Sequence, residues 1–117
     1  MNKKDHLIFL KHILESIRSI ESFSKGLSKG KFENDRLKRS AILRELEIIG
    51  EAAKNIPPSF KNKHPEVPWK EIIGTRDIII HHYFGVDLDI VWNIINKNLP
   101  DLKKKIENIL KNKEKEK

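Results

Sequence analysis

Cysteine is absent from the 117 residues, which excludes disulfide bonds and zinc sites built on thiolates. Valine and threonine, which favour strands, are scarce, and no segment alternates apolar and polar residues with a period of two. Charged residues interrupt every apolar run, so none approaches the roughly 20 residues of a membrane helix or resembles the core of a signal peptide. We therefore expect a cytoplasmic, helical protein that does not enter a membrane.

The chain is also short and basic. A length of 117 residues favours one domain, which we expect to span residues 1–112 and to end in a basic, frayed or disordered tail at 113–117. The net charge is +7, and residues 103–117 contribute +4 of it through seven lysines and three glutamates. Such a balance attracts nucleic acid, although a solvated Lys/Glu-rich helix end has the same composition.

Apolar residues recur every three or four positions, which predicts a succession of amphipathic helices. Glycine and serine at 26–30 predict a first loop, and the proline-rich residues 57–68 predict the longest one. Pro100 either kinks the last helix or opens a fifth one. Stripes of this kind are buried most simply in an antiparallel bundle of four to five helices. The predicted helices cover residues 5–24, 34–56 and 68–82, and a last helical region starts near Asp87 or Asp89. Asn34 or Asp35 could cap the second of these helices.

The predicted helix 68–82 carries a charged residue on its apolar side. Arg76 falls among isoleucines, and an arginine is costly to bury unless a carboxylate pairs with it. Arg76 therefore either forms an ion pair with the preceding helix or lines a cleft or a subunit interface. The candidate partners are Glu45, Glu47 and Glu51, of which Glu45 has the most favourable helical phase.

Two histidines and a tyrosine follow Arg76. His81 and His82 lie near the end of the predicted helix, where the helix dipole favours a protonated imidazole. Histidine titrates near neutral pH, which suits acid–base chemistry, although a solvated helix cap is an ordinary role too. Tyr83 lies two helical turns after Arg76 and could pack at the rim of the core or contact a ligand. Adjacent histidines point about 100° apart on a helix, so we expect no metal site here.

The order of these residues resembles a known motif. Arg76, His81 and Tyr83, separated by four residues and by one, are similar to the motif of HepT-like toxins, a branch of the HEPN superfamily. The polar Asp77 directly after the arginine also fits that pattern, and the similarity covers about residues 5–110. Three further stretches resemble the family, namely 41–53, 68–76 and 98–100.

The resemblance implies an all-α, HEPN-like antiparallel bundle that forms homodimers, with two motifs facing a shared cleft. It implies a metal-independent endoribonuclease that needs no cofactor, with Arg76 and His81 as catalytic residues and Asp77 in support. It also implies the toxin of a type II-like toxin–antitoxin pair. The expected partner is an MntA-like nucleotidyltransferase antitoxin, which transfers AMP from ATP onto Tyr83.

Two other functions are compatible with the same residues. The chain could be a non-catalytic, dimeric RNA-binding module in which Arg76 forms a structural ion pair. It could also be a substrate-binding accessory subunit of a nucleotidyltransferase. Unfolding of an Arg76→Ala variant would favour the first alternative, and Tyr83 without AMP after co-expression with an active partner would favour the second.

Overall fold

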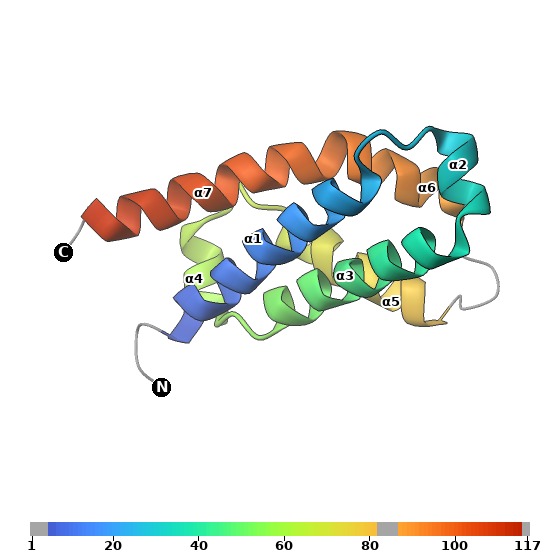
Figure 1. Ribbon diagram of the computed structural model, residues 1–117. Coiled ribbons are helices and arrows are strands. Elements are labelled where there is room, and N and C mark those ends of the chain that lie inside the picture. The colour runs from blue at the N-terminus through green and yellow to red at the C-terminus, as the bar shows by residue number, and fades with distance from the viewer. Residues whose placement is uncertain (1–4, 82–86, 116–117) are drawn as a thin grey trace.

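The computed structural model describes residues 5–81 and 87–115, and all regular elements in these residues are helical. Four long helices form the body of the molecule, and shorter helical segments connect them (Figure 1). The predicted all-helical fold is therefore confirmed. The long helices are α1 (Asp5–Ser24), α3 (Arg36–Lys54), α5 (Trp69–His81) and α7 (Leu99–Lys115). The short segments are α2 (Lys29–Asn34), α4 (Pro58–Lys63), α6 (Leu88–Asn93) and the π-helical η1 (Ile94–Asn98).

The core lies where the predicted apolar stripes meet. Helices α1 and α3 run side by side in opposite directions, and α7 packs on α1 (Figure 1). Ile13 of α1, Ile42 of α3 and Ile106 of α7 are each fully buried. Full burial of such a side chain stabilises the fold by about 1.5–3 kcal/mol, so these stripes fix how the long helices pack.

Aspartates begin two of the helices. The Asp35 carboxylate accepts a hydrogen bond from the Lys38 backbone N–H at 3.0 Å and caps α3. The Asp87 carboxylate accepts from the Asp89 N–H at 2.9 Å and caps α6. Each satisfies a backbone donor that has no partner inside the helix. The structure thus selects Asp35 and Asp87 from the caps that the sequence left open.

Two segments that we expected to be loops contain short helices, so those predictions are wrong in part. Helix α2 begins after Ser28, whose side chain accepts from the Lys31 N–H at 3.2 Å, and it buries Phe32 completely. Helix α4 has Pro58 in its first turn and buries Phe60. A six-residue helix shows no readable period and depends on tertiary contacts. One buried phenylalanine supplies those contacts in each case.

Pro100 lies in the first turn of the last helix, which is one of the two predictions that the sequence allowed. In η1 the Leu99 N–H donates to the Ile94 carbonyl, five residues back, and α7 follows directly with Pro100 in its first turn. Pro100 has no N–H to donate, and the π-helical turn directly before it is where the regular α-helical hydrogen bonding changes. Helix α7 continues to Lys115, inside the predicted tail, and residues 116–117 lie outside the described part. None of the described helices is long and apolar enough to cross a membrane.

Candidate functional site

Helices α3 and α5 pack tightly against each other at Gly50. A β-carbon added to Gly50 would lie 2.5 Å from Cβ of Arg76 and 3.3 Å from the carbonyl oxygen of Ile72. Carbon atoms in favourable contact lie about 3.5–4.0 Å apart, so a side chain at residue 50 would push the helices apart. Only glycine permits this spacing, which places Arg76 directly against the α3 backbone.

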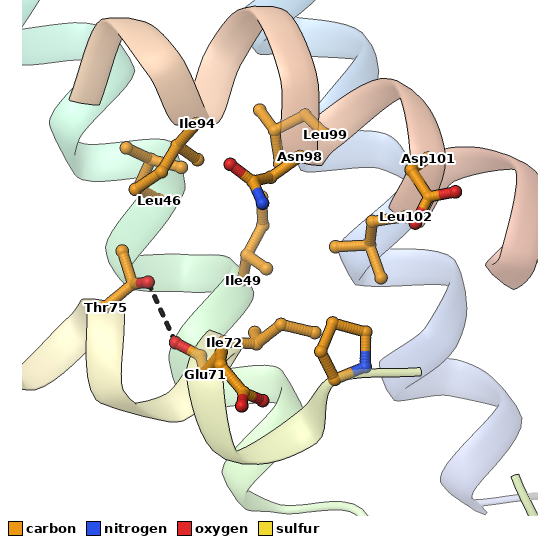
Figure 2. A pocket seen from close by; sticks show the side chains of 11 residues that line it. Leu46, Ile49, Glu71, Ile72, Thr75, Ile94, Asn98, Leu99, Asp101 and Leu102 are labelled. Carbon is orange, nitrogen blue, oxygen red and sulfur yellow. Dashed lines mark hydrogen bonds between the residues drawn. The ribbon is translucent and has the colours of Figure 1, made fainter. Parts of the chain in front are cut away.

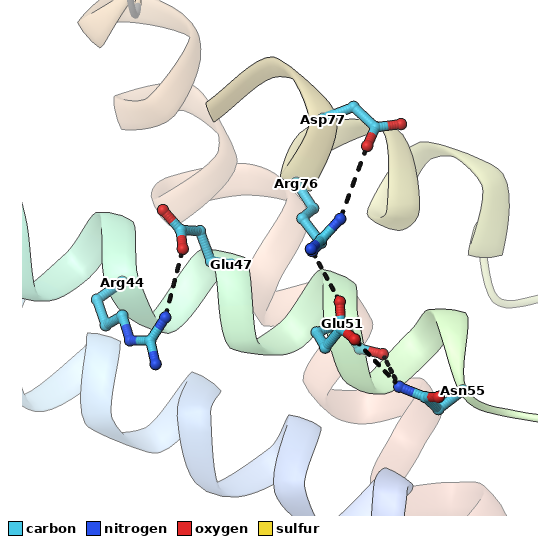
Figure 3. Close-up of polar contacts among 6 residues, drawn as sticks. All are labelled: Arg44, Glu47, Glu51, Asn55, Arg76 and Asp77. Carbon is cyan, nitrogen blue, oxygen red and sulfur yellow. Dashed lines mark hydrogen bonds and ion pairs between the residues drawn. The ribbon is translucent and has the colours of Figure 1, made fainter. Parts of the chain in front are cut away.

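The residue after Gly50 holds the guanidinium of Arg76. Arg76 Nε lies 2.8 Å from Glu51 Oε2, and Arg76 Nη1 lies 3.9 Å from Asp77 Oδ1 (Figure 3). On the far side of Glu51, the Asn55 amide donates to the Glu51 backbone carbonyl at 2.9 Å. The Arg76 side chain is 26% exposed, so its guanidinium is ion-paired but still reaches solvent.

The Nη groups of Arg76 have no hydrogen bond to the side chains that the structure describes, which do not include those of residues 78–81. Among the described side chains, their nearest carboxylate is that of Asp77, 3.9 Å from Nη1. A guanidinium held through Nε keeps its plane fixed and can present the Nη donors to an oxyanion. The arrangement therefore suits recognition of a phosphate group.

The other two candidate glutamates do not pair with Arg76. Glu45 lies six residues before Glu51, about 9 Å along the axis of α3. One of its carboxylate oxygens is buried and has no hydrogen-bond partner among the described residues. Glu47 pairs instead with Arg44 at 3.4 Å (Figure 3). Helical phase favoured Glu45, whereas the position of the crossing at Gly50 decides which glutamate Arg76 reaches.

Part of the predicted motif lies outside the described residues. Helix α5 ends at His81, five residues after Arg76 and about 7.5 Å further along the helix axis. The His81 side chain is not described, nor are His82 and Tyr83. The structure therefore brings together Arg76, Asp77 and Glu51, and it places the backbone of His81 at the end of the same helix.

Gly50 and Asn55 are site residues that the sequence analysis did not single out. Gly50 interrupts an otherwise strong helical stripe, and a glycine inside a helix often marks a close approach of another backbone. That signal was available in the sequence. Asn55 gave no comparable signal, because its role depends on the end of α3 lying next to the Arg76–Glu51 pair.

A cavity of about 200 Å³ lies between α3, the first half of α5 and the start of α7 (Figure 2). Most of its lining is aliphatic, and Thr75, at its edge, donates a hydrogen bond to the Glu71 carbonyl at 2.9 Å. Neither Arg76 nor Glu51 lines it. The lining residues are Leu46, Ile49, Pro68, Glu71, Ile72, Thr75, Ile94, Asn98, Leu99, Asp101 and Leu102. The cavity therefore has a mainly apolar lining with two carboxylates, those of Glu71 and Asp101.

Metal ligands do not gather at Arg76. Across the part of the chain that the structure describes, no three His, Asp or Glu side chains form a group that could hold an ion. The described carboxylates beside Arg76 are those of Glu51 and Asp77, and both form ion pairs with its guanidinium.

A family comparison covers the whole of this site. The protein-family model described as "Ribonuclease HepT-like" matches residues 13–109, which include Gly50, Glu51, Arg76 and His81. The chain belongs to the HepT-like ribonuclease family.

Individual HepT-like relatives align along almost all of this chain. A Thermococcus cleftensis protein named "Probable ribonuclease HepT" is 44% identical over 109 residues, which cover 93% of this chain and 99% of that protein. A Methanocaldococcus jannaschii protein named "Putative RNase" is 44% identical over 111 residues, with coverage of 95% and 92%.

Another relative is about twice as long. This Methanocaldococcus jannaschii protein is named "Gamma-glutamylcyclotransferase and putative RNase" and is 44% identical over 115 residues. The aligned region covers 98% of this chain but only 52% of the relative, so this chain spans about half of its length. No solved structure matches this chain significantly.

Proposed function

We propose that this protein is a metal-independent endoribonuclease in which Arg76 and His81 act on the RNA phosphate. The observation that carries the proposal is the geometry of Arg76. Its Nε is fixed by Glu51 at 2.8 Å, and its side chain remains 26% exposed. Membership of the HepT-like ribonuclease family supports RNA as the substrate.

The proposed reaction uses the RNA as its own nucleophile. The 2′-hydroxyl loses its proton to a base and attacks the adjacent phosphorus, and the bond to the 5′-oxygen of the next nucleotide breaks. The products are a 2′,3′-cyclic phosphate and a 5′-hydroxyl, which takes up a proton from an acid. His81 supplies this acid–base chemistry, and Arg76 stabilises the charge that develops on the phosphorane oxygens. Asp77 supports the arginine from the adjacent position.

Two copies of the chain complete this chemistry. One imidazole cannot serve as both base and acid at the same moment, and a homodimer with its α5 helices facing a shared cleft supplies two. The partly exposed guanidinium of Arg76 supports such a cleft, because it remains accessible in the single chain. The resemblance to dimeric HepT-like toxins supports the same arrangement.

Removal of the His81 imidazole is the first test of this reaction. Wild-type protein should cut single-stranded RNA in excess EDTA and leave 2′,3′-cyclic phosphate ends. The His81→Ala variant should cut about 10²–10⁴-fold more slowly, the usual contribution of one acid–base group. Circular dichroism should show the same helix content in both proteins. RNA binding without any cleavage by wild type would instead support the non-catalytic RNA-binding alternative.

The toxin–antitoxin role is a second part of the proposal. An MntA-like nucleotidyltransferase would transfer AMP from ATP to the Tyr83 hydroxyl, which releases pyrophosphate. Bound AMP would add negative charge and bulk to the motif and would oppose RNA binding.

Intact mass after co-expression tests this modification. Protein made with an active antitoxin should gain the mass of at least one adenylyl group, whereas a Tyr83→Phe variant should gain none. The modified protein should also cut RNA more slowly. An unmodified Tyr83 beside an active partner would contradict this mode of neutralisation and favour the accessory-subunit alternative.

A further inference from the structure

The positive charge of the chain is concentrated in two segments. Residues 25–39 contain six Lys or Arg and two carboxylates, for a net charge of +4. Residues 103–117 also contribute +4, and the remaining residues therefore sum to −1 because the whole chain carries +7. The first segment holds short helix α2 and the start of α3. Its charge is thus fixed on ordered, folded elements.

Four cations of this segment surround an open depression of about 540 Å³, which we name the basic hollow: Lys25, Lys31, Arg36 and Lys38. The only carboxylate in its lining is Asp35. That carboxylate already accepts the Lys38 backbone N–H at 3.0 Å as the cap of α3. The hollow therefore has an excess of positive charge at its surface.

The cations of the basic hollow form no ion pair with the described residues, whereas the neighbouring Lys29 and Arg39 each have a polar partner. Among the described residues, none of the four lies within ion-pair distance of a carboxylate. In contrast, Lys29 pairs with Asp89 at 2.6 Å, and that hydrogen bond and charge raise the pKa of Lys29. Arg39 donates to the Glu33 backbone carbonyl. Lys29 and Arg39 are thus engaged in contacts within the fold, whereas the four cations of the basic hollow can contact a ligand.

The basic hollow lies at the end of the molecule toward which α5 runs. Helix α2 and the start of α3 are at the same end as the last turn of α5, and both chain termini are at the other end (Figure 1). Lys38 lies twelve residues before Gly50, or roughly 18 Å along α3. Along the axis of α3, the crossing at Gly50 and the hollow are therefore separated by the length of a few nucleotides.

We infer that the basic hollow binds backbone phosphates of the RNA substrate, away from the bond that is cut. This inference rests on the proposed function, because it extends the substrate path from the Arg76 site. Lysine and arginine side chains that track a single strand supply affinity without reading its sequence. Residues of the hollow would therefore set KM for RNA, and Arg76 and His81 would set kcat.

The test removes three charges from the hollow in a Lys25→Gln/Lys31→Gln/Lys38→Gln variant. Binding is measured by fluorescence anisotropy with a short 2′-O-methyl RNA, which cannot be cut by attack of the 2′-hydroxyl. The variant should bind about tenfold to a hundredfold more weakly at 0.1 M salt, and the slope of log K against log salt should fall by about 2. With cleavable RNA, KM should rise similarly while kcat stays within about twofold of wild type.

A matched control removes the same charge at the other end of the molecule. Lys11, Lys63 and Lys111 are exposed and make no ion pair with described residues, so their triple glutamine variant changes net charge equally. It should bind RNA nearly as wild type does. Equal weakening in both variants, or none in the first, would overturn the inference.

Two further measurements distinguish the remaining explanations, namely binding of poly-glutamate and cleavage of natural RNA. If poly-glutamate bound the hollow as tightly as the RNA does, the surface would belong to an acidic protein and the inference would fail. If wild type left natural RNA uncut while the hollow variant still lost binding, the catalytic proposal would fail and the phosphate site would stand.

Discussion

Replacing Arg76 by alanine should lower the rate of RNA cleavage by about 10²–10³-fold, the usual effect of removing one donor from a developing oxyanion. The protein should stay folded. The partly exposed Arg76–Glu51 ion pair contributes at most about 1 kcal/mol, since half of the Glu51 side chain faces solvent. Alanine is also a slightly better helix former than arginine, which offsets part of that loss. The lost activity would therefore report on chemistry and not on unfolding.

An Arg76→Lys variant separates charge from geometry. Lysine keeps the positive charge but lacks the planar fork and the Nε that pairs with Glu51. We expect its kcat to lie between those of wild type and Arg76→Ala, with a similar KM. Single-turnover rates and urea unfolding curves would measure both effects. Full activity of Arg76→Lys would show that the orientation fixed by Glu51 is unimportant.

Gly50→Ala should damage stability and activity together. Its β-carbon would meet Cβ of Arg76 at 2.5 Å, and this atom cannot move without the α5 backbone. Overpacking of this kind costs about 1–3 kcal/mol, and the better helix propensity of alanine returns only about 0.5–1 kcal/mol. We expect a net loss of about 1–2 kcal/mol in the free energy of unfolding. A shift of Arg76 by an ångström should also slow cleavage by about a hundredfold.

Gly74→Ala is the matched control for that substitution. Gly74 lies on α5, and a β-carbon there meets nothing within 4 Å. The variant should gain about 0.5–1 kcal/mol from helix propensity and keep wild-type activity. Urea unfolding and RNA cleavage would compare the two variants directly. Equal behaviour of Gly50→Ala and Gly74→Ala would contradict the role assigned to the close crossing.

The fold was largely predictable because its long helices each bury a regular stripe. The period of three to four residues located α1, α3 and α5 to within about two residues at each end, as far as the described residues extend. Helices α2 and α4 were not predicted, because six residues are too few to show a helical period of apolar residues. Each depends on one phenylalanine, Phe32 or Phe60, packing on a core that the local sequence does not describe.

The candidate site was predictable where its residues share one helix. Arg76, Asp77 and His81 stand in a fixed order on α5, so sequence spacing alone groups them. The partner of Arg76 was not decided by sequence, because it depends on where two helices cross. Gly50 sets that crossing, and Glu51, not Glu45, lies beside it.

The most direct test of this account measures RNA cleavage in EDTA under single-turnover conditions for wild type, Arg76→Ala and Arg44→Ala. Arg44 is the matched control, since it also pairs with a glutamate of α3, Glu47, at 3.4 Å. We predict that wild type and Arg44→Ala cut at equal rates and that Arg76→Ala is about a hundredfold slower or worse. Equal rates for folded Arg76→Ala and wild type would contradict the account.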